Sequence, residues 1–169
     1  IQQDGRQLDA GTVTYDRATD LFTAQGDIVF SAEQIRLQGD HAEMNLQTSE
    51  GFVDNGRFQV GTVNGRGTAK KIVLQNRHEI ALDDATYTTC PPDDIAWQLS
   101  AAEIHLNNDN HQGTAKHMVL RVGHIPILYV PYVRFPIGDE RLSGFLFPGI
   151  GVSDNHGTEI SIPYYWNIA

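Results

Sequence analysis

The stretch GTAKKIVL, Gly67 to Leu74, returns as GTAKHMVL, Gly113 to Leu120, which is an offset of 113 minus 67, or 46 residues. Alternating segments precede the copies: DHAEMNL from Asp40, DDATYTT from Asp83 and SAAEIHL from Ser100. Each unit would hold a few strands that cannot cover their apolar face alone and must stack on neighbouring units. Chance similarity within a strand-rich chain is the alternative.

Period-two alternation of apolar and polar residues recurs in short runs, whereas helical periodicity is rare. Breaks such as QGD, VDNG, VNGRG and NNDN separate these runs, as turns between antiparallel strands require. The sequence therefore predicts an all-β fold, either a sandwich, a roll or a barrel-like solenoid. The expected strands cover residues 27–30, 34–38, 42–47, 51–53, 57–60, 67–75, 79–82, 85–88, 97–100, 103–106 and 112–122.

Long aliphatic residues occur in pairs spaced two apart, so both members of a pair point to one side of a sheet. We expect these pairs to line a common interior. A packed core is one interpretation, and a hollow interior lined for lipid is the other; the alternation is compatible with both. The pairs are Ile35 and Leu37, Met44 and Leu46, Ile72 and Leu74, Ile80 and Leu82, and Ile104 and Leu106.

The formal net charge of -9 over 169 residues argues against nucleic acid as a partner, because that binding depends on Lys and Arg neutralising phosphates. No apolar run is long enough to predict a transmembrane helix. The opening residues IQQDGRQLDA lack the basic start and apolar run of a signal peptide. We expect any such segment to have been removed.

From Gly123 onward the composition changes, with prolines at 126, 131 and 136 among aromatic and aliphatic residues. Proline cannot donate a hydrogen bond to a sheet, so this segment is expected to be an edge strand or a connection.

Two later segments, GFLFPGIGV from Gly144 and EISIPYYWNIA from Glu159, alternate in the manner of transmembrane β-barrel strands. We expect them to form the first hairpin of a larger, incomplete barrel; strands of a soluble sandwich are the alternative. Pro148 and Pro163 lie mid-strand, where each removes a ladder hydrogen bond. They could weaken a seam that opens sideways, or they could be ordinary edge-strand prolines beside a turn.

Cys90 is the single cysteine and lies in TYTTCPPDD. A buried, inert thiol is one interpretation. The polar turn that follows favours half of a disulfide whose partner lies elsewhere.

An enzyme is the competing functional class, because the chain has seven histidines and several carboxylates. No HxH or HExxH spacing occurs, and GTVNGRG lacks the ending of a phosphate-binding loop. His105 and His117 fall in different expected strands. We therefore predict no catalytic residues, no metal site and no cofactor.

Three segments closely resemble the LptD family, also called organic solvent tolerance proteins: TYTTCPPDD, HIPILYVPYVRFPIGDERLSGFLFP and IPYYWNIA. YDRATDLFTAQGDIVF and the GTA repeat look like the periplasmic OstA-type fold shared with the bridge protein LptA. The family inserts lipopolysaccharide into the outer leaflet of the outer membrane of Gram-negative bacteria.

The resemblance implies a twisted, open β-jelly roll in the periplasm over residues 1–122, whose interior passes lipid A acyl chains from LptA onward. It implies a Pro-rich final strand or connection over 123–143 and the first two barrel strands over 144–169. A structural or adhesive β-repeat module with a filled core is the alternative.

Site residues and partners also follow from the resemblance. Pro148 and Pro163 match the kinking prolines beside a lateral gate, and Cys90 matches a cysteine that pairs with the far end of the barrel. The lipoprotein LptE would plug the barrel. A sheet edge near residues 11–15 would pair with LptA.

Overall fold

The structure is a computed structural model that describes residues 2–3, 6–32, 35–61, 64–137, 144–145, 149–153, 157–161 and 164–165. It is an all-β fold whose main body is one antiparallel sheet of eleven strands, and no α-helix occurs in these residues. The strands are β1 (Gln2–Gln3), β2 (Arg6–Asp9), β3 (Thr12–Asp16), β4 (Leu21–Ala32), β5 (Ile35–Asn45), β6 (Gly51–Val60), β7 (Gly65–Leu74), β8 (Glu79–Thr88), β9 (Trp97–Asn107), β10 (Gln112–Val122), β11 (Ile125–Pro136), β12 (Gly144–Phe145), β13 (Gly149–Ser153), β14 (Gly157–Ser161) and β15 (Tyr164–Tyr165).

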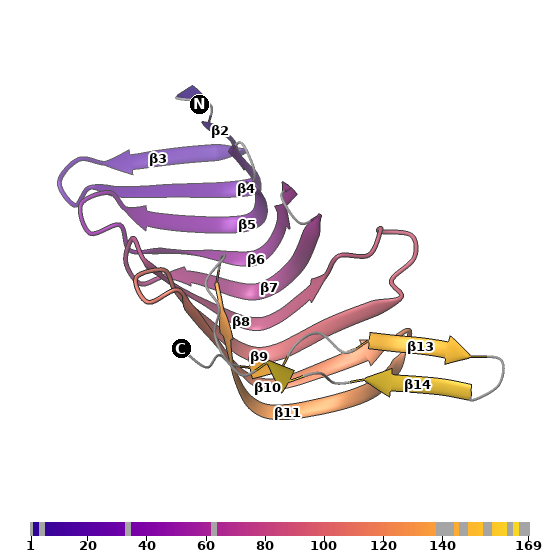
Figure 1. The fold of residues 1–169 in the computed structure, drawn as a ribbon. Helices are drawn as coiled ribbons and strands as arrows, with labels where there is room; N and C mark the ends of the chain where they lie inside the picture. The colour runs from indigo at the N-terminus through magenta and orange to yellow at the C-terminus, as the bar shows by residue number, and fades with distance from the viewer. Residues whose placement is uncertain are drawn as a thin grey trace.

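The sheet is a meander from β4 to β11, in which each strand pairs with the next along the chain (Figure 1). At one edge, β2 and β3 both pair with β4, over different parts of its length. At the other edge, the Pro-rich strand β11 pairs with β10 from Gln112 opposite Pro136 to Val122 opposite Ile125. Proline is tolerated there because an edge strand has one side without a sheet partner.

Two small separate pairs follow the main sheet. Strand β13 pairs with β14, with Ile150 opposite Ile160, and β12 pairs with β15. The antiparallel pairing of β13 with β14 is the arrangement that a hairpin requires. Whether these strands belong to a barrel stays a prediction.

The strands are longer than the sequence predicted, because neighbouring short runs join into one strand. The expected strands 34–38 and 42–47 are joined, in that 35–38 and 42–45 belong to the single strand β5, and 79–82 with 85–88 belong to β8. The supposed breaks lie inside strands. At these positions the alternation of inward and outward side chains is shifted by one residue. In a regular strand, side chains on one face are an even number of residues apart. The buried residues Ala69 and Ile72 of β7 are instead three apart.

These one-residue shifts lie next to one another on neighbouring strands and form a line across the sheet, which we call the crease. The crease crosses the seven strands β4 to β10 near residues 27, 40, 55, 70, 84, 102 and 117, in that order. Alternate strands pass the crease through a positive φ, at Asp27, Asn55, Asp84 and His117. Asn and Asp tolerate this left-handed conformation better than most residues. The strands bend midway, so the sheet curves around one face (Figure 1).

The core lies at the crease and is built from small and medium side chains. Val53, Ala69, Ile72, Leu82 and Ala85 form its buried cluster. No large side chain among those described is fully buried. The core is therefore shallow, as expected for a bent single sheet whose two halves are not sealed by a second layer.

The GTAK copies lie on β7 and β10, which run in opposite directions because three antiparallel pairings separate them. The 46-residue offset is therefore not the structural repeat. Turn residues show the true repeat, since Asn45, Asn76 and Asn107 follow one another at intervals of 31 residues (76 minus 45, and 107 minus 76). Two strands and their turns make up this unit.

Each of these asparagines closes a turn through its side-chain oxygen. The Oδ1 atom of Asn76 accepts hydrogen bonds from the backbone N–H groups of His78 and Glu79, at 2.8 and 2.9 Å. Asn107 Oδ1 likewise accepts from Asp109 and Asn110. Such side-chain turns are the usual role of Asn outside regular structure.

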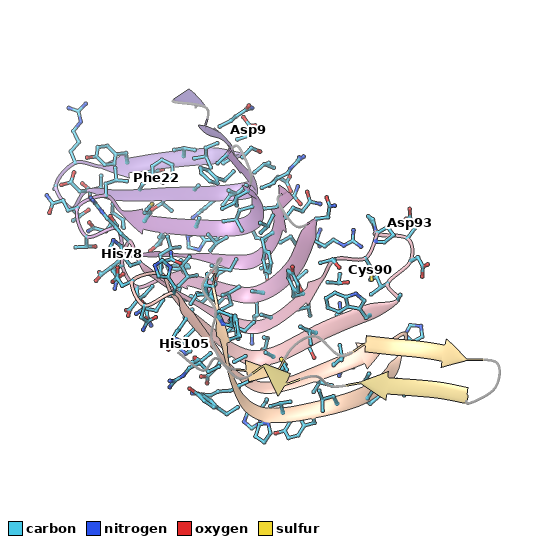
Figure 2. The ribbon with its side chains drawn as sticks, viewed as in Figure 1. Asp9, Phe22, His78, Cys90, Asp93 and His105 are labelled. Atoms are coloured by element: carbon cyan, nitrogen blue, oxygen red, sulfur yellow. The ribbon has the colours of Figure 1, made fainter. Side chains whose placement is uncertain are left out.

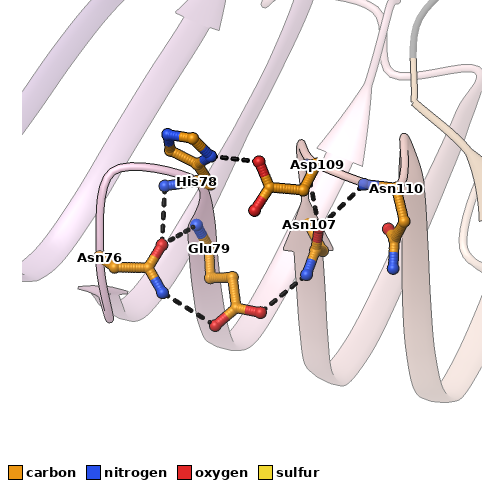
Figure 3. A network of polar contacts seen from close by, with 6 residues as sticks. All are labelled: Asn76, His78, Glu79, Asn107, Asp109 and Asn110. Carbon is orange, nitrogen blue, oxygen red and sulfur yellow. Dashed lines mark hydrogen bonds and ion pairs between the residues drawn. The ribbon is translucent and has the colours of Figure 1, made fainter.

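Neighbouring turns are also joined sideways (Figure 3). The Glu79 carboxylate accepts hydrogen bonds from Asn76 Nδ2 at 3.0 Å and from Asn107 Nδ2 at 2.7 Å. His78 contacts Asp109 in the next turn. A typical hydrogen bond contributes about 1 kcal/mol net, so this ladder of turns helps to fix the stagger of successive strand pairs.

Candidate functional site

The bent sheet carries one apolar face, which is assembled from cross-strand rows. In one row, Ile72 lies opposite Leu82, and Leu82 lies opposite Ile104. In the row beside it, Leu74 lies opposite Ile80, and Ile80 lies opposite Leu106. The predicted pairs of three strands thus share one half of the face.

The remaining predicted residues lie on β5 or in the turn after it. Met44 belongs to the row of Leu74, because Met44 lies opposite Gly51 and Gly51 lies opposite Leu74. Leu37 and Ile35 lie on the other side of the crease, opposite Phe58 and Val60. Leu46 follows the end of β5.

Burial falls from the crease toward the strand ends. Ile72 and Leu82 are each 7% exposed. Four of the other predicted residues are half-buried and pack against their cluster: Leu37, Ile80, Ile104 and Leu106. Met44 and Leu74 are half-buried. Ile35 is 49% exposed and Leu46 is 50% exposed. The face is therefore filled at the crease and open toward its rim.

Sequence reasoning missed the aromatic residues of the far half of this face. Phe58 lies opposite Leu37, and Tyr87 lies opposite Leu99. The Tyr87 and Trp97 rings are 6.2 Å apart, and burial raises the pKa of Tyr87. Each aromatic residue lies directly opposite a small or aliphatic residue of a neighbouring strand. A period-two search within single strands cannot detect such cross-strand partners.

The opposite face, which we call the outer face, carries the charged residues. Lys116 Nζ lies 2.6 Å from Glu103 Oε2, and a hydrogen bond from Lys116 lowers the pKa of Glu103. The contribution of this pair to stability would be lost as the pH falls through that lowered pKa. It is a surface pair and contributes little. The two faces therefore differ in chemistry, with binding of apolar groups favoured on one only.

The histidines that the structure describes do not gather at one site. His105 lies 3.7 Å from Glu103, and His117 Nδ1 lies 2.6 Å from the Tyr129 hydroxyl, on different strands. In the described ranges no three His, Cys, Asp or Glu side chains come close enough together to hold a metal ion. No helix in the same part of the chain has the length and apolar character that a membrane crossing needs.

Cys90 lies just after β8, at the end of the strands opposite the His78 turn (Figure 2). The thiol is free and half-buried, and the Thr88 hydroxyl lowers its pKa. The Cys90 backbone N–H donates to Thr88 Oγ1 at 3.0 Å. The thiol is thus not sealed in a core, and its pairing in a disulfide stays a prediction.

Two further predicted features differ in how far the structure describes them. Pro148 and Pro163 lie outside the described residues. Strand β3, Thr12–Asp16, is exposed at all five positions and pairs only with β4 among the described strands. Its outward edge has the form that an added strand could extend.

Comparisons with known proteins give the family. No family model matches the chain. It is 38% identical over 169 residues to the LPS-assembly protein LptD of Saccharophagus degradans, covering 100% of this chain and 20% of that protein. It is 39% identical over 170 residues to LptD of Acinetobacter baylyi, covering 100% and 21%.

Among solved structures, the chain is similar to LptH of Pseudomonas aeruginosa, the LptA-homologous periplasmic component of a lipopolysaccharide transport device. The TM-score is 0.49 at 10% identity, over 71% of this chain and 82% of that one. The chain spans about a fifth of the length of these curated relatives, and each match covers the whole of this chain. Over its whole length, the chain is therefore homologous to one segment of the LptD proteins.

Proposed function

We propose that this chain binds the acyl chains of lipopolysaccharide on its apolar face during transport to the outer membrane. The observation that best supports this proposal is a continuous apolar face. Among the described residues, none of its large side chains is fully buried. Removing apolar surface from water gives about 0.8 kcal/mol per CH₂ group. A fatty tail lying along the rows would therefore be held without any polar contact.

The proposal concerns a carrier with no catalytic step. A structural module with a filled core would seal its apolar residues, whereas Ile35 and Leu46 are half exposed. Weak, distributed apolar contacts suit a lipid in transit, because no single contact has to break at high cost. The assembly role in the names of the relatives favours the same function.

The arrangement of the whole protein is part of the proposal. Residues 1–122 form the periplasmic jelly roll, 123–143 lead to the barrel, and 144–169 begin a barrel in the outer membrane. LptA adds a strand at the exposed edge of β3, which is the β-augmentation mode of binding. LptE plugs the barrel, and Cys90 pairs with a cysteine in its distal end.

Pro148 and Pro163 weaken the barrel seam at a lateral gate in this proposal. Replacing either proline by alanine in a full-length LptD carrying this segment restores a ladder donor. Lipopolysaccharide insertion, measured as its appearance at the cell surface, should become slower while protein levels stay normal. Insertion at the unchanged rate would contradict the gate.

Photo-crosslinking tests the proposed binding face. The purified chain carries a photoreactive residue at Leu37 or Leu106, both half-buried on the apolar face, and is illuminated with lipopolysaccharide. Adducts are expected at both positions because each lies beside the open part of the face.

His105 is the matched control, because it is the chain neighbour of Leu106 and points to the outer face. We expect few adducts at this control position. Equal labelling on both faces, or no labelling in a correctly folded chain, would contradict lipid binding at the apolar face.

A further inference from the structure

Three arginines gather on the outer face near the ends of β5, β6 and β7. Arg36 lies opposite Gln59, and Gln59 lies opposite Arg66. Arg57 lies on the strand between them, opposite Gln38 and Thr68. Adjacent strands are about 4.8 Å apart, so long guanidinium side chains from β5 and β7 can reach one bound group.

These arginines line a groove of about 240 Å³ together with glutamine and threonine residues of β5 to β9 and with Phe58, Gly67 and Ile95. No carboxylate is among the residues that line it. That is unexpected in a chain with 21 acidic and 12 basic residues. On the same face beyond the crease, Lys116 is paired with Glu103.

Arg66 has an unsatisfied hydrogen-bond donor beside the groove. Its Nη2 atom is buried and has no hydrogen-bond partner. Leaving a buried donor without a partner is unfavourable, and more so when the group is charged. By contrast, Arg121 at the far side of this face donates to Ser100 Oγ at 2.6 Å.

Guanidinium groups beside hydroxyls and amides make the donor set that binds phosphate. Arg presents a planar fork of N–H donors that matches the oxygens of a phosphate. Thr68 on β7 and Thr86 on β8 add hydroxyl groups, which lie 2.8 Å apart and hydrogen-bond each other. The acidic remainder of the surface repels anions, so the groove is where an anion would concentrate.

The groove also lies beside the rim of the apolar face. Arg36 and Arg66 are each the second residue of their strand, directly after Ile35 and Gly65, which point to the apolar face. A lipid whose tails lie along the apolar rows would bring its headgroup to these strand ends. The apolar and cationic surfaces therefore suit one amphipathic ligand.

We infer that Arg36, Arg57 and Arg66 form a phosphate-binding site, which receives a phosphate group of the glycolipid headgroup while the acyl chains lie on the apolar face. The assignment of the phosphate to the lipid rests on the proposed function. The phosphate site itself rests on the groove, its three guanidinium groups and the unpartnered Arg66 donor.

Calorimetric titration of the purified chain tests this site with three probes: lipid A, chemically dephosphorylated lipid A with the same acyl chains, and inorganic pyrophosphate. The R36Q/R66Q double variant should bind lipid A roughly tenfold more weakly and should lose measurable pyrophosphate binding. Its affinity for dephosphorylated lipid should equal that of the unchanged chain. R134Q is the control, because it removes one exposed arginine from β11 beyond the crease.

The outcomes separate this site from the proposed function. If the double variant binds all three probes like the unchanged chain, or loses both lipids equally, the phosphate site is wrong. Continued crosslinking at Leu37 would then leave the lipid-binding face intact. Binding of pyrophosphate that depends on Arg36 and Arg66, without binding of either lipid, would support the site and contradict the proposed function.

Discussion

Replacing Gly67 by alanine should destabilise the chain by about 3 kcal/mol or more, within the range of severe overpacking. A Cβ atom at Gly67 would lie 1.9 Å from the Thr86 carbonyl oxygen and 2.5 Å from Phe58 Cζ. The Thr86 oxygen is backbone on the paired strand, so relief requires moving β8 away from β7. Urea unfolding followed by circular dichroism measures the loss.

Gly56→Ala is the matched comparison, because it adds the same methyl group to a buried glycine of the next strand. The nearest atom there is the Cδ1 atom of Ile72, at 2.5 Å, which is the end of a side chain that can rotate. We expect a loss of about 1 kcal/mol, partly offset by the lower chain entropy of alanine in the unfolded state. Equal losses in the two variants would contradict a backbone clash at Gly67.

Gly67 also shows why the GTAK motif occurs twice although the copies are not structurally equivalent. Gly67 lies opposite Phe58, and Gly113 lies opposite Phe135. A Cβ atom at Gly113 would lie 2.4 Å from the Phe135 ring. Each glycine gives an aromatic ring of the next strand room to lie over the backbone, a device that pairs aromatic residues with glycine in sheets.

The all-β class and the residues of the apolar rows could be predicted, because alternation within a strand directly reports which side chains share a face. The length of each strand could not. Asn55 and Asp84 read as turn residues by composition, whereas here they carry a strand through the crease with positive φ. A residue with positive φ occurs both in a turn between two strands and in a bend within one strand. Only the pairing with the neighbouring strand, which continues past a bend but not past a turn, distinguishes the two.

The sequence allowed the apolar face to be predicted in part, and the arginine groove not at all. Ile72 and Leu82 could be found as a same-face pattern, but the sequence could not show that they are buried while Ile35 is half exposed. That difference arises from distance to the crease, which depends on register. The arginine groove was missed for the same reason, because Arg36, Arg57 and Arg66 are far apart along the chain and become neighbours only through strand pairing.

The filled crease and the open rim should respond differently to side-chain truncation. Ile72→Ala removes a buried side chain from the core cluster and should cost about 2–4 kcal/mol in unfolding free energy. Ile35→Ser removes a side chain that is 49% exposed and should change stability by no more than about 0.5 kcal/mol. The rim variant should nevertheless bind lipopolysaccharide several-fold more weakly, because it loses apolar area that the lipid would cover.

Unfolding free energy and lipid affinity are measured on both variants, with affinity determined at a temperature where each is fully folded. The folded Ile72→Ala chain should keep most of its lipid affinity, because Ile72 is only 7% exposed within the buried cluster and offers a lipid little surface. If the apolar face served only as a core, lipid affinity would follow unfolding free energy. Each variant would then lose affinity in proportion to its loss of stability. Loss of affinity at Ile35 without loss of stability separates a binding surface from an incompletely packed core.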